Sequence, residues 1–173
     1  MPGMGDERFA RAVIFVCAHG DEGAMGIVVN RPTPDMKLKD LAAHLEVEIS
    51  DPRDLPIHMG GPVEPGRGFV LHSDDWDGEV STTAAGPGFA LTSTRDAIEA
   101  LAAGGGPDRA LMALGYSGWG EGQLEGELAQ GAWLTAPATA DLVFGARDAE
   151  KWNAAIRSLG VDPVSLSAQT GRA

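Results

Sequence analysis

The sequence has one cysteine and few basic residues, and each scarcity excludes a class of protein. Cys17 stands alone among 173 residues, so an intramolecular disulfide is excluded and a reducing compartment is the simplest expectation. The 13 Lys and Arg residues are outnumbered by 25 Asp and Glu residues, which leaves a net charge of −12. Because this charge repels phosphates and anionic lipids, we expect no direct binding to DNA or to membranes.

Long hydrophobic runs are also missing. The longest apolar stretch, residues 12–18, is far shorter than the ~20 residues that a membrane-spanning helix needs. Residues 1–8 (MPGMGDER) lack the basic and apolar regions of a secretory signal. The hydrophobic fraction of 43% is sufficient for one complete core. We therefore predict a soluble, cytoplasmic protein with a single domain over residues 1–173.

Short apolar runs and helical periodicities are interspersed along the chain. The runs rich in β-branched residues predict strands at 12–17, 25–29, 57–59, 69–72 and 110–114, with weaker ones at 80–83 and 89–91. Apolar residues at helical spacing predict helices at 36–45, 93–104, 123–130 and after Asp148. The order lacks a regular βαβ rhythm, so we predict the α+β class.

Some details of this layout can be stated more closely. Residues 12–17 and 25–29 can pair as a hairpin, and the two prolines in residues 31–34 are expected to end the sheet. Leu38, Leu41 and Leu45 form one apolar stripe on the first predicted helix. Gly160 is the expected stop of the last helix, which places Trp152 and Ile156 inward.

The glycine-rich segment at 115–122 (GYSGWGEG) lies between a predicted strand and a predicted helix. Such connections can cradle phosphates, but the spacing matches neither G-x-G-x-x-G nor the P-loop, and no lysine follows. Ser117 resembles the serine of a nucleophile elbow, except that Trp119 occupies the position of the second glycine. The pattern favours a tight turn anchored by Trp119.

Two pairs of side chains suggest possible enzyme chemistry. Cys17 and His19 lie two residues apart on a predicted strand, which is typical of side chains on one face. One interpretation of this pair is a thiol nucleophile, and the other is a small buried hydrophobe, which is the more common role of a cysteine in an apolar strand. Glu125 and Glu127 could serve acid–base catalysis if a cleft buried them. We predict no metal and no cofactor, because the histidines show no ligand spacing.

Several strings occur together in a specific order. They are residues 2–6 (PGMGD), 19–32 (HGDEGAMGIVVNRP), 60–63 (GGPV), 68–73 (GFVLHS), 115–127 (GYSGWGEGQLEGE), 132–134 (AWL) and the ending around Trp152 and Leu159. In this order the chain resembles the bacterial AlgH/YqgE family over nearly its whole length. The resemblance implies a complex α+β fold, in which a bifurcated mixed sheet curls into a pseudo-barrel flanked by about three to four helices.

The chain departs from the family pattern at two positions. Family members usually begin with a further apolar strand ahead of the string at 2–6, whereas this sequence starts at Met1. The lack of that strand would leave an exposed sheet edge. Ser117 stands where many relatives have alanine, so the resemblance gives no support to a serine nucleophile.

The family has no established reaction and is commonly labelled a transcriptional regulator. Arg31, Lys37 and Lys39 form only a small basic patch, with no helix-turn-helix after it. We therefore expect indirect regulation through a protein partner or a small ligand. The candidate binding surface comprises His19, Asn30, His72, Trp119, Gln123 and Glu125. The alternative is a hydrolase or redox enzyme that uses Cys17 and His19, or Glu125 and Glu127.

Overall fold

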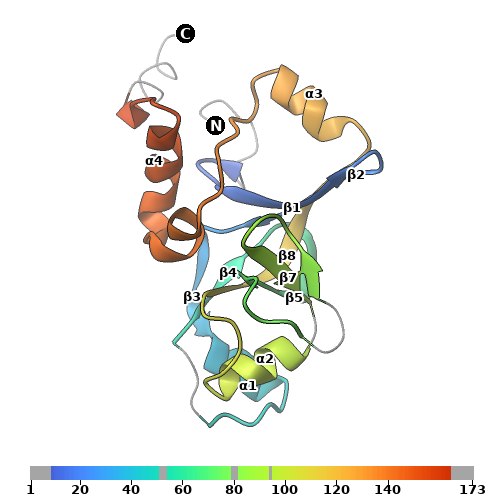
Figure 1. The fold of residues 1–173 in the computed structure, drawn as a ribbon, viewed down its shortest axis with the longest axis vertical. Helices are drawn as coiled ribbons and strands as arrows, with labels where there is room; N and C mark the ends of the chain where they lie inside the picture. The colour runs from blue at the N-terminus through green and yellow to red at the C-terminus, as the bar shows by residue number, and fades with distance from the viewer. Residues whose placement is uncertain (1–8, 51–53, 79–81, 94, 165–173) are drawn as a thin grey trace.

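The computed structural model describes residues 9–50, 54–78, 82–93 and 95–164 (Figure 1). The motif at residues 2–6, the start of the strand predicted from Val80, and Thr94 lie outside the described residues. The strands are β1 (Ile14–Gly20), β2 (Gly23–Val28), β3 (Pro32–Lys37), β4 (Pro56–Met59), β5 (Val63–Ser73), β6 (Thr82–Ala84), β7 (Phe89–Thr92) and β8 (Ala110–Trp119). The helices are α1 (Leu38–His44), α2 (Arg95–Ala102), α3 (Gln123–Ala129), the π-helical turn η2 (Asp141–Gly145) and α4 (Asp148–Ser158).

β8 is the strand at which the sheet divides. One edge of β8 pairs with β5 along most of its length. Residues 112–114 of β8 pair in parallel with β4, whereas residues 117–119 pair in antiparallel with β2. The main path runs β1-β2-β8-β5-β7-β6, and β3 joins through β4. The bifurcated, curled mixed sheet and the α+β class are therefore as predicted.

The division at β8 depends on glycines that let two backbones touch. Gly115 has φ +70, and a Cβ there would lie 2.5 Å from the carbonyl oxygen of Gly61. A Cβ on Gly60 would lie 2.3 Å from the carbonyl oxygen of Gly115. Side chains at these positions would separate the crossing chains. The prediction of a loop over residues 115–122 is therefore wrong for its first half, because β8 continues through Gly115 as far as Trp119.

Two further sequence predictions are corrected by the fold. The prolines at 31–34 do not end the sheet, because Pro32–Lys37 forms β3 against β4 with an irregular register. β3 tolerates proline because β4 is its one partner among the described strands, so one row of N–H groups is not needed for pairing. On α1, Ala42 is buried and Leu45 is exposed, because the helix ends at His44.

Alternate side chains of the central strands pack into two separate hydrophobic cores. Phe69, Leu71 and Leu111 belong to one cluster, and Val70 and Met112 belong to the other. Helices α1 and α2 cover the second cluster, and Figure 1 shows them together at one end of the molecule. Helices α3 and α4 lie toward the opposite end. The first cluster therefore faces the part of the molecule where α4 and the chain before it approach β1.

Candidate functional site

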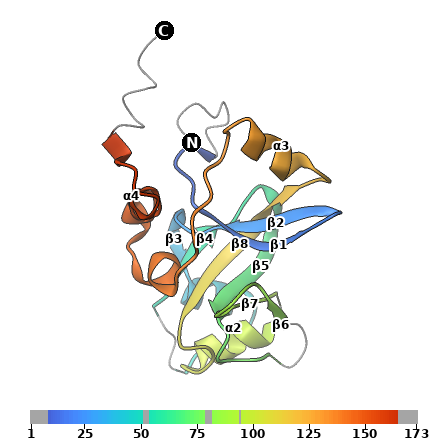
Figure 2. The same cartoon turned by 45° about the horizontal axis from the view of Figure 1, so that its top comes forward.

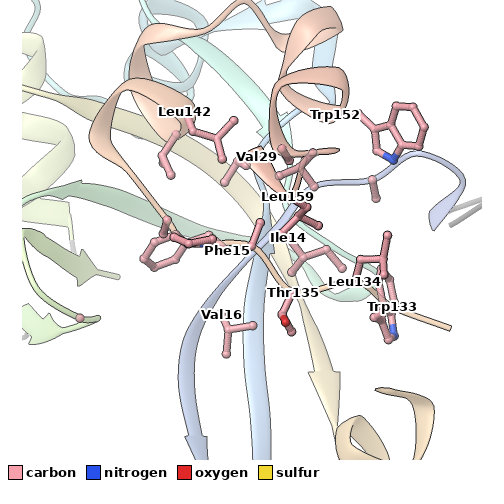
Figure 3. A pocket seen from close by; sticks show the side chains of 18 of the residues that line it. Ile14, Phe15, Val16, Val29, Trp133, Leu134, Thr135, Leu142, Trp152 and Leu159 are labelled. Carbon is pink, nitrogen blue, oxygen red and sulfur yellow. The ribbon is translucent and has the colours of Figure 1, made fainter. Parts of the chain in front are cut away.

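A cavity of about 520 Å³ opens between β1, α4 and the chain that links α3 to η2. It is lined by residues 12–16 on the β1 side, by residues 133–138 and by the α4 residues Trp152, Ala155 and Ile156. Figure 3 shows side chains of β1 and of residues 133–135 in one region of the molecule, with Ile14 near Leu134. We call this cavity the apolar groove, because its lining is dominated by aliphatic and aromatic side chains.

The apolar groove is open along its rim. Val16 of β1 is 42% exposed and Leu134 on the facing wall is 45% exposed. Residues 133–139 form no helix or strand, and Figure 2 shows this connection running from α3 past the β1 side of the sheet toward η2. Apolar residues on both rims are in contact with water. Covering them with a partner would lower the free energy, because apolar surface would be removed from water.

The carboxylate of Glu127 on α3 joins two tryptophans that line the groove, Trp119 and Trp133. Its Oε2 accepts hydrogen bonds from Trp119 Nε1 at 3.0 Å and Trp133 Nε1 at 2.6 Å, and its Oε1 accepts one from Gln123 Nε2 at 2.8 Å. The two indole rings pack edge to face at 6.0 Å. Desolvation acts to raise the pKa of Glu127, but the three donors outweigh it, so the pKa lies below its ordinary value.

His19 donates a hydrogen bond to the carboxylate of Glu125. The pair connects the tip of the β1–β2 hairpin to α3, and both side chains are about half exposed (53% and 52%). The hydrogen bond from His19 lowers the pKa of Glu125. Gln123 also accepts a hydrogen bond from Gly120 N at 3.1 Å, which fixes the turn before α3. Four of the predicted surface residues, His19, Trp119, Gln123 and Glu125, are therefore brought together.

Asn30 lies elsewhere but supports the same groove. Its Oδ1 accepts a hydrogen bond from Val13 N at 2.8 Å, and its Nδ2 donates to the carbonyl of Arg11 at 2.9 Å. Asn30 thereby holds the chain that enters β1 and lines the groove. Arg11 places its guanidinium over the ring of Trp152, 5.2 Å from the centroid.

His72 is separate from this group and is fully buried. Its Nδ1 donates to the carbonyl of Ser73 at 2.7 Å, and its Nε2 accepts from Thr92 Oγ1 at 2.9 Å. Trp76 packs edge-on against the ring at 5.5 Å. Both ring nitrogens are therefore engaged within the fold, away from the groove.

Cys17 is buried in the first core, and its hydrogen-bond partner is the carbonyl of Phe15 and not the ring of His19. Its Sγ lies 3.6 Å from the carbonyl of Phe15, and burial raises the pKa of the thiol to about 12. Cys17 also sits where the β1–β2 register is interrupted. A protonated thiol is a poor nucleophile, and His19 is engaged by Glu125 instead. The described residues contain no group of three or more His, Cys, Asp and Glu arranged to hold a metal.

A buried ionic network below α4 was not predicted from the sequence. Lys151 Nζ lies 2.9 Å from Asp148 Oδ1, which also accepts a hydrogen bond from His58 Nε2 at 3.0 Å. Desolvation acts to raise the pKa of Asp148, but the hydrogen bonds from His58 and Lys151 keep it below its ordinary value. The i, i+3 spacing of Asp148 and Lys151 was visible in the sequence, but nothing there indicated that His58, 90 positions away from Asp148, completes the network.

These features define a mixed α+β protein with a curled half-barrel sheet and an apolar groove beside its terminal strand. The chain belongs to the AlgH-like family, whose model matches residues 1–164. The chain is 50% identical to a UPF0301 protein of Ruegeria pomeroyi over 175 residues, which cover 100% of this chain and 95% of that relative. It is 48% identical to a UPF0301 protein of Paracoccus denitrificans over 176 residues, with 100% and 93% coverage.

Solved structures show the same fold. The solution structure of the AlgH protein from Pseudomonas aeruginosa superimposes with a TM-score of 0.79 at 40% identity, covering 100% of this chain and 92% of that one. A crystal structure of a Corynebacterium diphtheriae protein shares the fold with a TM-score of 0.72 at 20% identity, covering 99% and 87%. The family resemblance predicted from the sequence strings is thus confirmed.

Proposed function

We propose that this protein is a cytoplasmic, non-enzymatic binding protein whose apolar groove holds a segment of a protein partner. Any role in transcription then runs through that partner and not through contact with DNA. The groove itself carries the proposal: about 520 Å³ lies within the size range of binding sites, and apolar side chains line both of its open rims.

The polar side chains around the groove support binding better than catalysis. Glu127 is saturated by three donors, which leaves it poorly placed to take a proton from a substrate. The buried thiol of Cys17 stays protonated at neutral pH, because its pKa is about 12. Among the described residues, no helix has the length and apolarity needed to cross a bilayer.

The basic residues support an indirect role. Among the described residues, six basic side chains are paired with carboxylates: Lys37, Arg67, Arg95, Arg109, Arg147 and Lys151. Lys37, part of the small basic patch near the first helix, is held by Asp54 at 2.7 Å. A net charge of −12 together with this pairing leaves little positive potential for a phosphate backbone.

The proposal is tested by titrating the protein with N-phenyl-1-naphthylamine, a neutral apolar dye that fluoresces on burial. We expect binding by the wild-type protein and a roughly tenfold weaker affinity for Leu134→Glu, which puts a charge on the groove rim. Met59→Glu is the matched control, since Met59 is 60% exposed on β4 and lies outside the groove.

Two outcomes contradict the proposal. Dye binding that is absent from the wild-type protein, or weakened equally by both substitutions, shows that the groove is not a binding site. A labelled DNA duplex provides the second measurement. Binding of the duplex at low salt that weakens steeply as salt is added shows phosphate contacts and refutes the indirect role.

A further inference from the structure

We infer that a second cavity binds a small aromatic molecule with one carboxylate, and that Arg67 receives this carboxylate. The cavity has a volume of about 570 Å³ and is lined by residues of β1, β2, β8 and β5, which are consecutive in the sheet (Figure 2). We call it the arginine cavity. It is separate from the apolar groove, with which it shares the lining residue Trp119, so the inference goes beyond the proposed function.

The strand register brings the lining residues of the arginine cavity onto one face of the sheet. Ala18 pairs with Met25, and Met25 pairs with Gly118. Tyr116 lies two positions before Gly118 on β8 and pairs with Val63 of β5. Paired residues on neighbouring strands, and residues two apart on one strand, point to the same face. The cavity therefore extends across four strands.

Gly118 leaves the centre of this face open. It is exposed, and a Cβ there would lie 3.4 Å from Cε2 of Tyr116 and 3.9 Å from Cγ2 of Val63. A side chain at this position would therefore occupy the space beside the tyrosine ring. Glycine inside a strand often marks a place that a ligand or another backbone approaches closely. Here it gives a flat ligand access to Tyr116.

Arg67 supplies a cation that the fold already orients. Its guanidinium lies over the ring of Phe69, 5.1 Å from the centroid, and the ring of Tyr116 meets Phe69 edge to face at 5.8 Å. The arginine and the tyrosine thus flank one buried phenylalanine. The cation–π contact fixes the plane of the guanidinium, and its N–H donors lie in that plane, where they match the two oxygens of a carboxylate.

Glu64 leaves most donors of Arg67 available to a ligand. Among the described residues, the arginine side chain donates one hydrogen bond, from Nη1 to Glu64 Oε2 at 3.0 Å, out of its five N–H groups. Both side chains are about half exposed, at 53% and 51%. An ion pair so exposed contributes little free energy, so a ligand carboxylate can share the guanidinium with Glu64 or replace it.

The nearby charges favour a ligand with a single negative charge. Glu22, in the turn between β1 and β2, lines the cavity and is exposed, and Glu64 is the partner of Arg67. One arginine balances one carboxylate, whereas a phosphate of nearly two charges is repelled by these glutamates and by the net charge of −12. The rings of Phe69 and Tyr116 favour an aromatic body. Together these features select an aromatic monocarboxylate.

The probe that tests the inference is 2-naphthoate, titrated into the protein at constant salt. Calorimetry measures its affinity, and NMR of the backbone amides locates it. We expect shifts at Tyr116 and Gly118, and an affinity at least roughly tenfold higher than that of the neutral 2-naphthamide. Arg67→Met should lower the affinity for 2-naphthoate by at least roughly tenfold and leave that for 2-naphthamide unchanged, because only the carboxylate needs the cation.

Two further variants separate this effect from a general loss of charge or fold. Arg95→Met is the matched control, since Arg95 is 56% exposed and paired with Glu99 but lies outside the cavity. It should bind 2-naphthoate like the wild-type protein. Gly118→Val fills the space beside Tyr116 and should weaken both 2-naphthoate and 2-naphthamide. Circular dichroism of each variant checks that the fold is retained.

Four results would overturn the inference. They are no binding of 2-naphthoate by the wild-type protein, equal affinities in Arg67→Met and Arg95→Met, and tighter binding of 2-naphthyl phosphate than of 2-naphthoate. The fourth is a set of amide shifts confined to residues 133–138, which would place the probe in the apolar groove and support the proposed function instead. Conversely, loss of dye binding in the groove leaves this inference intact if 2-naphthoate still binds through Arg67.

Discussion

Lys151 in α4 donates a hydrogen bond of 2.7 Å from its Nζ to the main-chain carbonyl of Val29, the residue that follows β2. The side chain is only 3% exposed, and Asp148 supplies the opposite charge. A buried ammonium group is stable only when it is paired and hydrogen-bonded, and here both conditions are met. The contact attaches α4 to the sheet, and α4 forms one wall of the apolar groove.

Replacement of Lys151 by methionine is expected to destabilise the protein by about 3 kcal/mol, near the low end of the range for a broken buried pair, because Asp148 keeps His58 as a partner. Urea unfolding followed by circular dichroism measures the change. Lys39→Met is the control, since Lys39 is exposed, and it is expected to stay within about 0.5 kcal/mol. Equal losses in the two variants would show that the buried network contributes nothing.

Acid is expected to weaken the same attachment. The pKa of Asp148 is lowered in the folded protein from 3.8, so folding favours the ionised carboxylate. Its contribution to stability is therefore complete above the unfolded pKa and is lost as the pH falls through the folded pKa. Urea midpoints between pH 7 and pH 3 should fall less steeply for Asp148→Asn than for the wild-type protein, although the variant starts from a lower stability. Parallel pH profiles would contradict this assignment.

The shared hydrogen bonds of Trp119 and Trp133 to Glu127, here called the Glu127 clamp, should fix the environment of the two indole rings. Glu127→Gln removes the charged acceptor, and we expect a loss of about 1 kcal/mol, kept small because the site is partly exposed. The tryptophan emission spectrum should shift as Trp119 and Trp133 lose their common partner. Glu125→Gln is the matched control on the same helix, and it should leave the emission unchanged because Glu125 contacts His19. Identical spectra for the two variants would refute the clamp.

The crossing of backbones at Gly115 gives a prediction about stability. Gly115→Ala adds both a left-handed strain and a clash with the carbonyl of Gly61, so a loss above about 3 kcal/mol is expected. Gly122 has a similar φ of +66 but open space around it, so Gly122→Ala should cost only about 1 kcal/mol, from strain alone. Thermal unfolding compares the two. A smaller loss at Gly115 than at Gly122 would show that the crossing chains relax easily.

The sequence by itself determined the elements that depend on local signals. The short apolar run at residues 110–114 predicts a buried strand, and the stripe of Trp152 and Ile156 with Gly160 behind it predicts α4 and its end. Specific strings indicated the family, and with it the bifurcated sheet. The net charge of −12 already argued against direct DNA binding before the structure was considered.

Only the tertiary structure decided which distant residues meet. The strand character of residues 115–119 could not be predicted, because its glycines are required by the crossing of Gly60 and Gly61, and glycine by itself suggests a loop. The approach of Lys151 to Val29 spans 122 positions. The groove arises between residues 12–16 and residues 133–138, which are equally remote in sequence. Local patterns report how a segment buries its own side chains, whereas a site between segments depends on packing over the whole chain.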